Sequence, residues 1–173
     1  MPSFHCVHMS EIERVTKVVV ERAPALALYA RQWLDAASAQ DVVQEALTSL
    51  LTQHPTPQDP VAWMFRAVRN AAIDHARAAS RRRRREREVA RTRREWFESR
   101  PDSLLDAHTA EQALLKLPAE LREIVVLRIW GGLGLAQIAR IVQLSVTTVH
   151  ERYVEALERM RIALERPCRN KMD

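Results

Sequence analysis

A group of hydrogen-bonding side chains stands at the start of a long helical pattern near the C-terminal end. A short apolar pattern over residues 135–142 is followed by the turn 143–145, and Ser145 is a good cap for a second helix. This is the helix-turn-helix arrangement, in which the second helix enters the DNA major groove. The groups at its start suit base edges and phosphates: Ser145, Thr147, Thr148, His150, Glu151 and Arg152. An ordinary helical hairpin with a solvated face is the alternative, because Glu151 and Glu155 repel phosphate.

A second polar stripe lies on a helix that the pattern predicts from Val61 into a run of arginines. Phe65, Val68, Ala72 and Ala76 line its apolar side. Polar residues recur every three or four positions on another side: Arg66, Arg69, Asn70, Asp74, Arg77 and Arg81. They can contact phosphates or bases, or they can satisfy one another, as Asp74 and Arg77 can at a spacing of three. The residues alone leave both interpretations open.

The positive charge of the chain is concentrated in one segment. Residues 77–100 hold eleven arginines and four glutamates, a net charge of +7, whereas the whole chain carries +5. The remainder is therefore slightly acidic. Such a run attracts nucleic acid electrostatically and does not read sequence. It also separates two helical halves of the chain.

No constellation for catalysis or for a cofactor emerges from the sequence. It has no glycine-rich phosphate loop, no HExxH and no nucleophile elbow, so we expect no enzyme. His5, Cys6 and His8 match no zinc motif, and we expect no metal. Cys6 and Cys168 predict a reducing compartment, and a redox role for them stays open. The apolar runs are too short for a membrane span, which needs about 20 residues, and no signal peptide is visible.

The composition and the helix-start and turn signals predict an all-α protein. Three glycines and 5% aromatic residues argue against a β-sandwich. Helix starts are predicted by capping boxes at 10–13, 38–41 and 109–112, by Asp59-Pro60 and by Pro118. The glycines at 131, 132 and 134 predict a reversal with positive φ angles. We expect two small helical domains, 10–85 and 109–166, joined by a basic linker, 86–108, with a helix-turn-helix in the second.

The apolar residues of the second domain predict its core. We expect a short helix over 110–116 that ends before Pro118, and a helix over 135–142 that buries Leu135, Ile138, Ala139 and Val142. The last helix carries its apolar residues on one side: Val146, Val149, Tyr153, Leu157, Met160 and Leu164. Leu144 and Val149 are expected to fill the joint between the two helices of the motif.

Three stretches, taken in order, resemble bacterial RNA polymerase sigma factors of the extracytoplasmic-function (ECF) type. They are DVVQEALTSLL (41–51), AWMFRAVRNAAIDHARAASRRRRR (62–85) and LPAELREIVVLRIWGGLGLAQIARIVQLSVTTVHERYVEALERMR (117–161). In that family the first stretch grips the polymerase, the second melts and reads the −10 promoter element, and the third binds the −35 element. The resemblance implies a cytoplasmic, nucleoid-associated protein that binds core RNA polymerase and promoter DNA. The family also allows an anti-sigma factor as a partner, although no residue here marks one.

The resemblance assigns roles to individual residues. Asp41, Gln44 and Glu45 would face the polymerase. The −10 DNA would lie along Arg66, Arg69, Asn70, Asp74 and Arg77, and the −35 DNA would meet Ser145, Thr147, Thr148, His150, Glu151 and Arg152. The chain departs from the family at Gln143, where glycine is common, so we expect α-helix 135–142 to end without a left-handed cap. Gly134 stands where the family commonly has Ser or Thr. A basic residue is favoured where His150 stands, and glutamate is uncommon at the position of Glu151.

Two other functions stay open on the residues alone. A stand-alone helix-turn-helix regulator that dimerises through its N-terminal helices would bind a palindromic operator tightly without polymerase. A nucleic-acid-processing enzyme or RNA-binding adaptor would use the arginine run and would keep its activity without residues 117–173.

Overall fold

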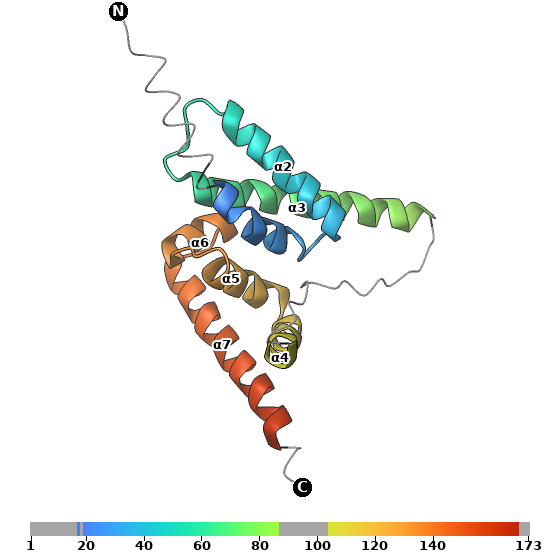
Figure 1. Cartoon of the computed structure of the whole chain (residues 1–173), viewed down its shortest axis with the longest axis vertical. Helices are drawn as coiled ribbons and strands as arrows, with labels where there is room; N and C mark the ends of the chain where they lie inside the picture. The colour runs from blue at the N-terminus through green and yellow to red at the C-terminus, as the bar shows by residue number, and fades with distance from the viewer. Residues whose placement is uncertain (1–16, 18, 87–103, 170–173) are drawn as a thin grey trace, which may run out of the picture. The chain divides into compact units, whose positions relative to one another are not determined.

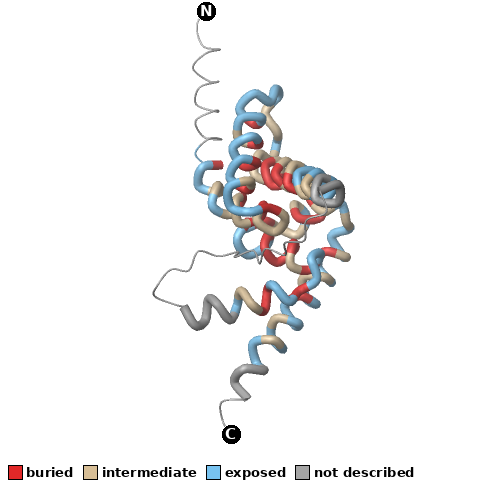
Figure 2. The backbone as a smooth tube through the Cα atoms, turned by 90° about the vertical axis from the view of Figure 1, so that its right-hand side faces the viewer, coloured by how far each residue is buried: buried red, intermediate tan, exposed pale blue. Residues whose placement is uncertain are grey.

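The computed structural model of the chain describes residues 17, 19–86 and 104–169, and their regular structure is helical throughout. The chain divides into two compact units, Met1–Thr92 and Arg93–Asp173. The prediction of an all-α fold is confirmed. Figure 2 shows that buried and exposed positions alternate along the helices, as expected for amphipathic helices packed on shared cores. Among the described helices, none is both long and apolar enough to cross a bilayer.

The first unit is built from a helix over residues 19–30 and two longer helices, α2 (Ala36–Thr52) and α3 (Pro60–Glu86). α2 and α3 pack against each other, and the described part of their core buries Val42, Phe65 and Val68 completely. Tyr29 on the first helix meets Phe65 edge-on, with ring centroids 5.5 Å apart. The aromatic contact therefore joins the first helix to α3.

The starts of α2 and α3 are set by two aspartates. Asp59 caps α3 as the sequence predicts, because the Ala62 N–H donates to its Oδ1 at 3.1 Å. The capping box expected at Ser38–Asp41 is wrong. Asp35 caps α2 instead, accepting from the Ser38 N–H at 2.9 Å. The helix therefore begins three positions before the start that the expected box predicts. Aspartate is as good a cap as serine, and the earlier of two candidates captures more helical hydrogen bonds. The box at 10–13 lies outside the described residues.

The second unit contains α4 (Leu104–Leu115), α5 (Ala119–Ile129), α6 (Leu135–Val142) and α7 (Val146–Arg169). α7 packs against the other three helices of this unit. Among the side chains of α7 described up to residue 165, Val149 and Ala156 are buried, whereas Val146, Leu157 and Leu164 are exposed, contrary to the expected stripe. On α6, Ile138, Ala139 and Ile141 are buried, and Leu135 and Val142 only partly so. A residue is buried when it lies on the side of its helix that neighbouring helices cover. The apolar periodicity of one helix does not show which side that is.

α4 begins at Leu104 and not at Ala110, so Thr109 falls inside the helix and does not cap it. The residues after Pro101 include no helix breaker before Pro118, and leucine and alanine favour helix. At its other end the Leu115 carbonyl accepts from Arg122 Nη1 at 3.3 Å, which joins α4 to α5. Burial lowers the pKa of Arg122 from its ordinary value.

The reversal between α5 and α6 uses a positive φ at one of its three glycines. Gly132 has φ 63°, whereas Gly134 has φ −73° and serves as the N-cap of α6. Arg128 Nη1 donates to the Leu133 carbonyl at 2.8 Å and holds the turn against α5. The turn thereby fixes where α6 starts relative to α5.

Candidate polymerase and promoter interface

The start of α7 is the better defined of the two candidate DNA surfaces. Ser145 Oγ accepts from the Thr148 N–H at 3.0 Å, which confirms the predicted cap. The same oxygen lies 2.8 Å from Thr148 Oγ1, so the Thr148 hydroxyl is already engaged in the cap. Val149 is completely buried in the joint with α6, and the Leu144 N–H donates to the Ala139 carbonyl at 3.1 Å. The cap and the joint together hold the first turns of α7 in place.

α6 ends with Gln143 in the left-handed conformation, at φ 59° and ψ 45°. The expectation that α6 would lack a left-handed cap is therefore wrong. The chain must reverse within three residues to let Val149 pack on α6, and this requirement overrides the preference of a non-glycine residue for negative φ. At the other end, Gln137 Oε1 accepts from the Gly134 N–H at 2.8 Å and supplies the side-chain half of a capping box.

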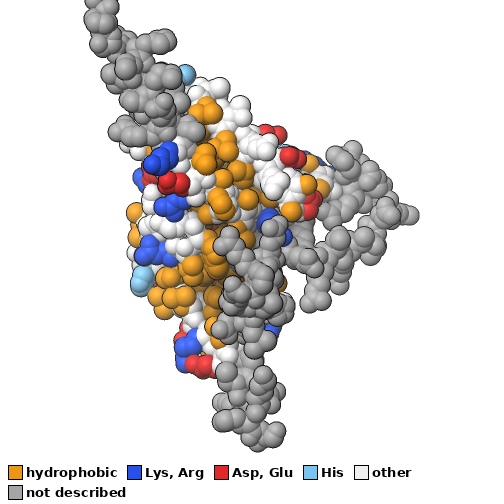
Figure 3. Space-filling view, in the orientation of Figure 1, with side chains coloured by type: hydrophobic (Ala, Val, Ile, Leu, Met, Phe, Trp, Pro, Cys, Tyr) orange, Lys and Arg blue, Asp and Glu red, His pale blue; other side chains and the backbone are white. Residues whose placement is uncertain are grey.

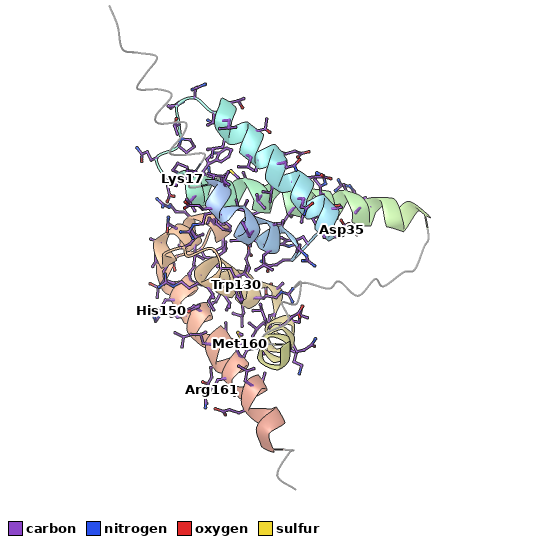
Figure 4. The ribbon with its side chains drawn as sticks, viewed as in Figure 1. Lys17, Asp35, Trp130, His150, Met160 and Arg161 are labelled. Atoms are coloured by element: carbon purple, nitrogen blue, oxygen red, sulfur yellow. The ribbon has the colours of Figure 1, made fainter. Side chains whose placement is uncertain are left out.

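The predicted −35 residues share the first two turns of α7 but differ in exposure. Thr147, His150 and Glu151 are exposed, whereas Thr148 and Arg152 are partly buried. Figure 4 shows His150 on the side of α7 away from Met160, which lies toward α4. A ligand reaching this end of α7 thus meets a hydroxyl, an imidazole, a carboxylate and a guanidinium, which are the group types that read base edges and phosphates.

Two cations farther along α7, Arg159 and Arg161, are paired with carboxylates. Arg161 donates to both oxygens of Glu158, at 3.0 and 2.7 Å, and to Glu165 at 2.7 Å, and Arg159 lies 2.7 Å from Glu155. The hydrogen bond from Arg161 lowers the pKa of Glu158, and its carboxylate partners raise the pKa of Arg161 above its ordinary value. Figure 3 shows blue and red side chains next to each other in the lower part of the molecule, and Figure 4 labels Arg161 on α7. This half of the helix is therefore suited to solvent more than to phosphate.

The predicted −10 residues form a polar side of α3. Arg66, Asn70, Asp74 and Arg77 are exposed, and Arg69 is partly buried. Arg77 Nη1 lies 3.7 Å from Asp74 Oδ1, so the pairing that the spacing allowed is present. Both side chains are about 70% exposed, at 69% and 73%, and such pairs contribute little and are screened by salt. The pair leaves Arg77 able to exchange its carboxylate for a phosphate.

The predicted polymerase-binding residues line an open groove of about 720 Å³ in the first unit. Asp41, Gln44 and Glu45 are all exposed on α2. The rest of the groove is lined by Thr48, Ser49, Thr52 and His75, which sequence reasoning missed. Thr48, Ser49 and Thr52 continue the spacing of three or four residues from Asp41 and Glu45, and this spacing indicates that they share one side of α2. His75 belongs to α3, and no local pattern connects it to the α2 residues.

The described residues contain no cluster of three or more His, Cys, Asp or Glu side chains placed to hold a metal ion. His5, Cys6 and His8 lie outside the described residues, and so does the side chain of Cys168.

Comparison with known proteins places this geometry in a family. The models for Sigma-70 region 2 and for Sigma-70, region 4 match residues 19–82 and 108–160. The ECF RNA polymerase sigma factor SigL of Mycobacterium tuberculosis is 35% identical over 156 residues, covering 84% of this chain and 85% of SigL. The RNA polymerase sigma-H factor of Pseudomonas aeruginosa is 31% identical over 156 residues, covering 81% and 80%.

The fold is likewise that of a solved sigma factor. The sigma factor RpoE of Bartonella quintana, crystallised with the anti-sigma factor NepR, superposes with a TM-score of 0.70 at 22% identity, covering 87% of this chain and 96% of that one. Its likeness concerns the arrangement of helices, and the identity and coverage of SigL establish the kinship. The chain therefore belongs to the ECF sigma factors, which direct transcription initiation by RNA polymerase.

Proposed function

We propose that this chain divides initiation between its two domains. Residues 10–85 bind core RNA polymerase and the −10 element, and residues 109–166 bind the −35 element. The observation that carries the proposal is the ordered match to regions 2 and 4, together with exposed polar surfaces on α2 and α3 in the first region and on α7 in the second. The chain itself performs no chemistry in this proposal. Its partners place its action in the cytoplasm, at the nucleoid.

The polymerase contact is assigned to Asp41, Gln44 and Glu45. Their exposure on one side of α2 supports it, because a partner can reach all three at once. The double variant D41N/E45Q removes two charges with little change of shape and is expected to weaken association with core polymerase about tenfold or more. The matched control E21Q/E120Q removes two exposed carboxylates elsewhere and should bind as the wild type does.

The DNA contacts are assigned to α3 and to the start of α7. Run-off transcription with purified core polymerase tests them, using R77A for the −10 surface and R152A for the −35 surface. Each variant should retain polymerase association and lose about tenfold in promoter-dependent transcript, since one base or phosphate contact contributes about 1–3 kcal/mol. Arg159 is held by Glu155, so R159A is the control and should transcribe normally.

The regulator alternative is not favoured, because both sigma regions match in order. A chain that ignored core polymerase and bound a palindromic operator as a dimer would overturn the proposal.

We also propose that an anti-sigma factor binds this chain, as NepR does RpoE in the structure of similar fold. Gel filtration of the chain with co-expressed candidate antagonists tests that partner.

A further inference from the structure

The groove on the first unit is shared by two helices. Six of its lining residues come from one side of α2, and His75 contributes from α3, which packs against α2. Figure 1 shows the first turns of α2 beside the middle of α3, so the Asp41 end of the groove meets the second half of α3. Anything that occupies the groove along Asp41 and Glu45 therefore also meets His75.

Two of the three hydroxyl groups that line the groove donate within α2 itself. Thr48 Oγ1 donates to the Gln44 carbonyl at 3.0 Å. Thr52 Oγ1 donates to the carbonyls of Thr48 and Ser49, at 3.2 and 3.1 Å. These threonines therefore offer methyl groups and little hydrogen-bonding capacity to a ligand.

The two carboxylates of the groove, by contrast, are open to a ligand. Within the described residues, Asp41 and Glu45 form no ion pair, and both are exposed. The other charged groups next to His75 on α3 are Asp74 and Arg77, and these pair with each other at 3.7 Å. The groove thus presents hydrogen-bond acceptors and net negative charge, to which a cationic, donor-rich side chain is complementary.

We propose that His75 is a specificity-determining residue of the polymerase-binding groove, facing a cationic side chain of the polymerase that enters between His75 and the α2 carboxylates. The imidazole ring can present an acceptor nitrogen to an arginine or lysine there, whereas a lysine at the same position offers only donors. A permanent cation at position 75 would repel the same group. The inference rests on the proposed function, in which this groove binds polymerase.

The experiment compares charge changes at position 75 with the same change outside the groove. His75→Lys is expected to lower the affinity for core polymerase about tenfold, and His75→Glu to hold or raise it, with both effects shrinking at high salt. Gln58→Lys adds an equal charge at an exposed position of the first unit that does not line the groove, and it should bind as the wild type does. Lysine and glutamate favour helix at least as well as histidine, so α3 should keep its helicity by circular dichroism.

Each outcome separates this inference from the proposed function. If D41N/E45Q weakens binding but His75→Lys and Gln58→Lys bind equally, the groove binds polymerase and the role of His75 is refuted. Equal losses from His75→Lys and His75→Glu would refute the cationic occupant. Failure of the wild type to bind would instead refute the proposed function. Shared contact with one cation also predicts that the losses from D41N/E45Q and His75→Lys are less than additive when combined, and full additivity would contradict it.

Discussion

Gln143 ends α6 in a conformation that L-residues other than glycine adopt at a cost. The sharp turn into α7 imposes φ 59° there, and the surrounding packing of Ile141 and Val149 maintains it. Glycine removes the contact between Cβ and the backbone that causes this cost. The residue therefore stores strain in a motif that the family usually builds with glycine.

Gln143→Gly is expected to raise the free energy of unfolding of the second unit by about 1 kcal/mol. Urea unfolding followed by the NMR amide signals of α6 and α7 measures the change. Ala136→Gly, on the exposed side of α6, should act in the opposite direction by a similar amount, about 1 kcal/mol, because glycine is unfavourable inside a helix. A loss of stability in Gln143→Gly would contradict the strain at this position.

On the scale of the element, α7 depends on its cap at one end and on its charge pairs at the other. Ser145→Ala removes the acceptor of the Thr148 N–H, and it should cost about 1 kcal/mol of stability and weaken −35 binding. Ser145→Asp keeps a good cap but adds a negative charge where we propose that the −35 DNA binds. It should therefore keep the melting temperature and still lose affinity for −35 DNA. Equal DNA affinity in Ser145→Asp and the wild type would place Ser145 away from the backbone of the DNA.

The far end of α7 should respond to acid. The hydrogen bond from Arg161 lowers the pKa of Glu158, so the folded state stabilises the charged carboxylate relative to the unfolded chain. This contribution is fully present above the ordinary glutamate pKa of about 4.3 and is lost as the pH falls through the lower, folded value. NMR titration of the Glu158 carboxyl group tests the direction, and Arg161→Gln should return its pKa toward the ordinary range. An unchanged titration in Arg161→Gln would contradict the assigned cause.

At the scale of the whole molecule, one covalent chain carries two units that are proposed to bind two promoter elements. A tether raises the effective concentration of the second unit once the first is bound. A protease site inserted at 93–103 tests this in the full-length chain. Cleavage should leave polymerase association intact and should reduce transcription from a promoter with both elements about tenfold or more at nanomolar protein. Undiminished transcription after complete cleavage would show that the connection is not needed.

Much of this protein could be predicted from local sequence because helix termini depend on neighbouring residues. The caps at Asp59 and Ser145 and the bounds of α6 follow from side chains within a few positions of the hydrogen bonds that they satisfy. The order of sigma regions 2 and 4 likewise follows from motifs that can be recognised along the chain. The early start of α4 also has a local signal, since the residues before Thr109 favour helix, but the capping pattern at Thr109 predicts a later start.

Tertiary structure decided what depends on residues far apart in the chain. Val146 and Leu157 share the apolar spacing of Val149, yet only Val149 of the three is covered by neighbouring helices. Gln143 takes a left-handed conformation because two helices must meet across it. His75 joins Asp41 and Glu45 in one groove because α3 packs on α2, and the periodicity of one helix carries no information about which residue of another lies beside it.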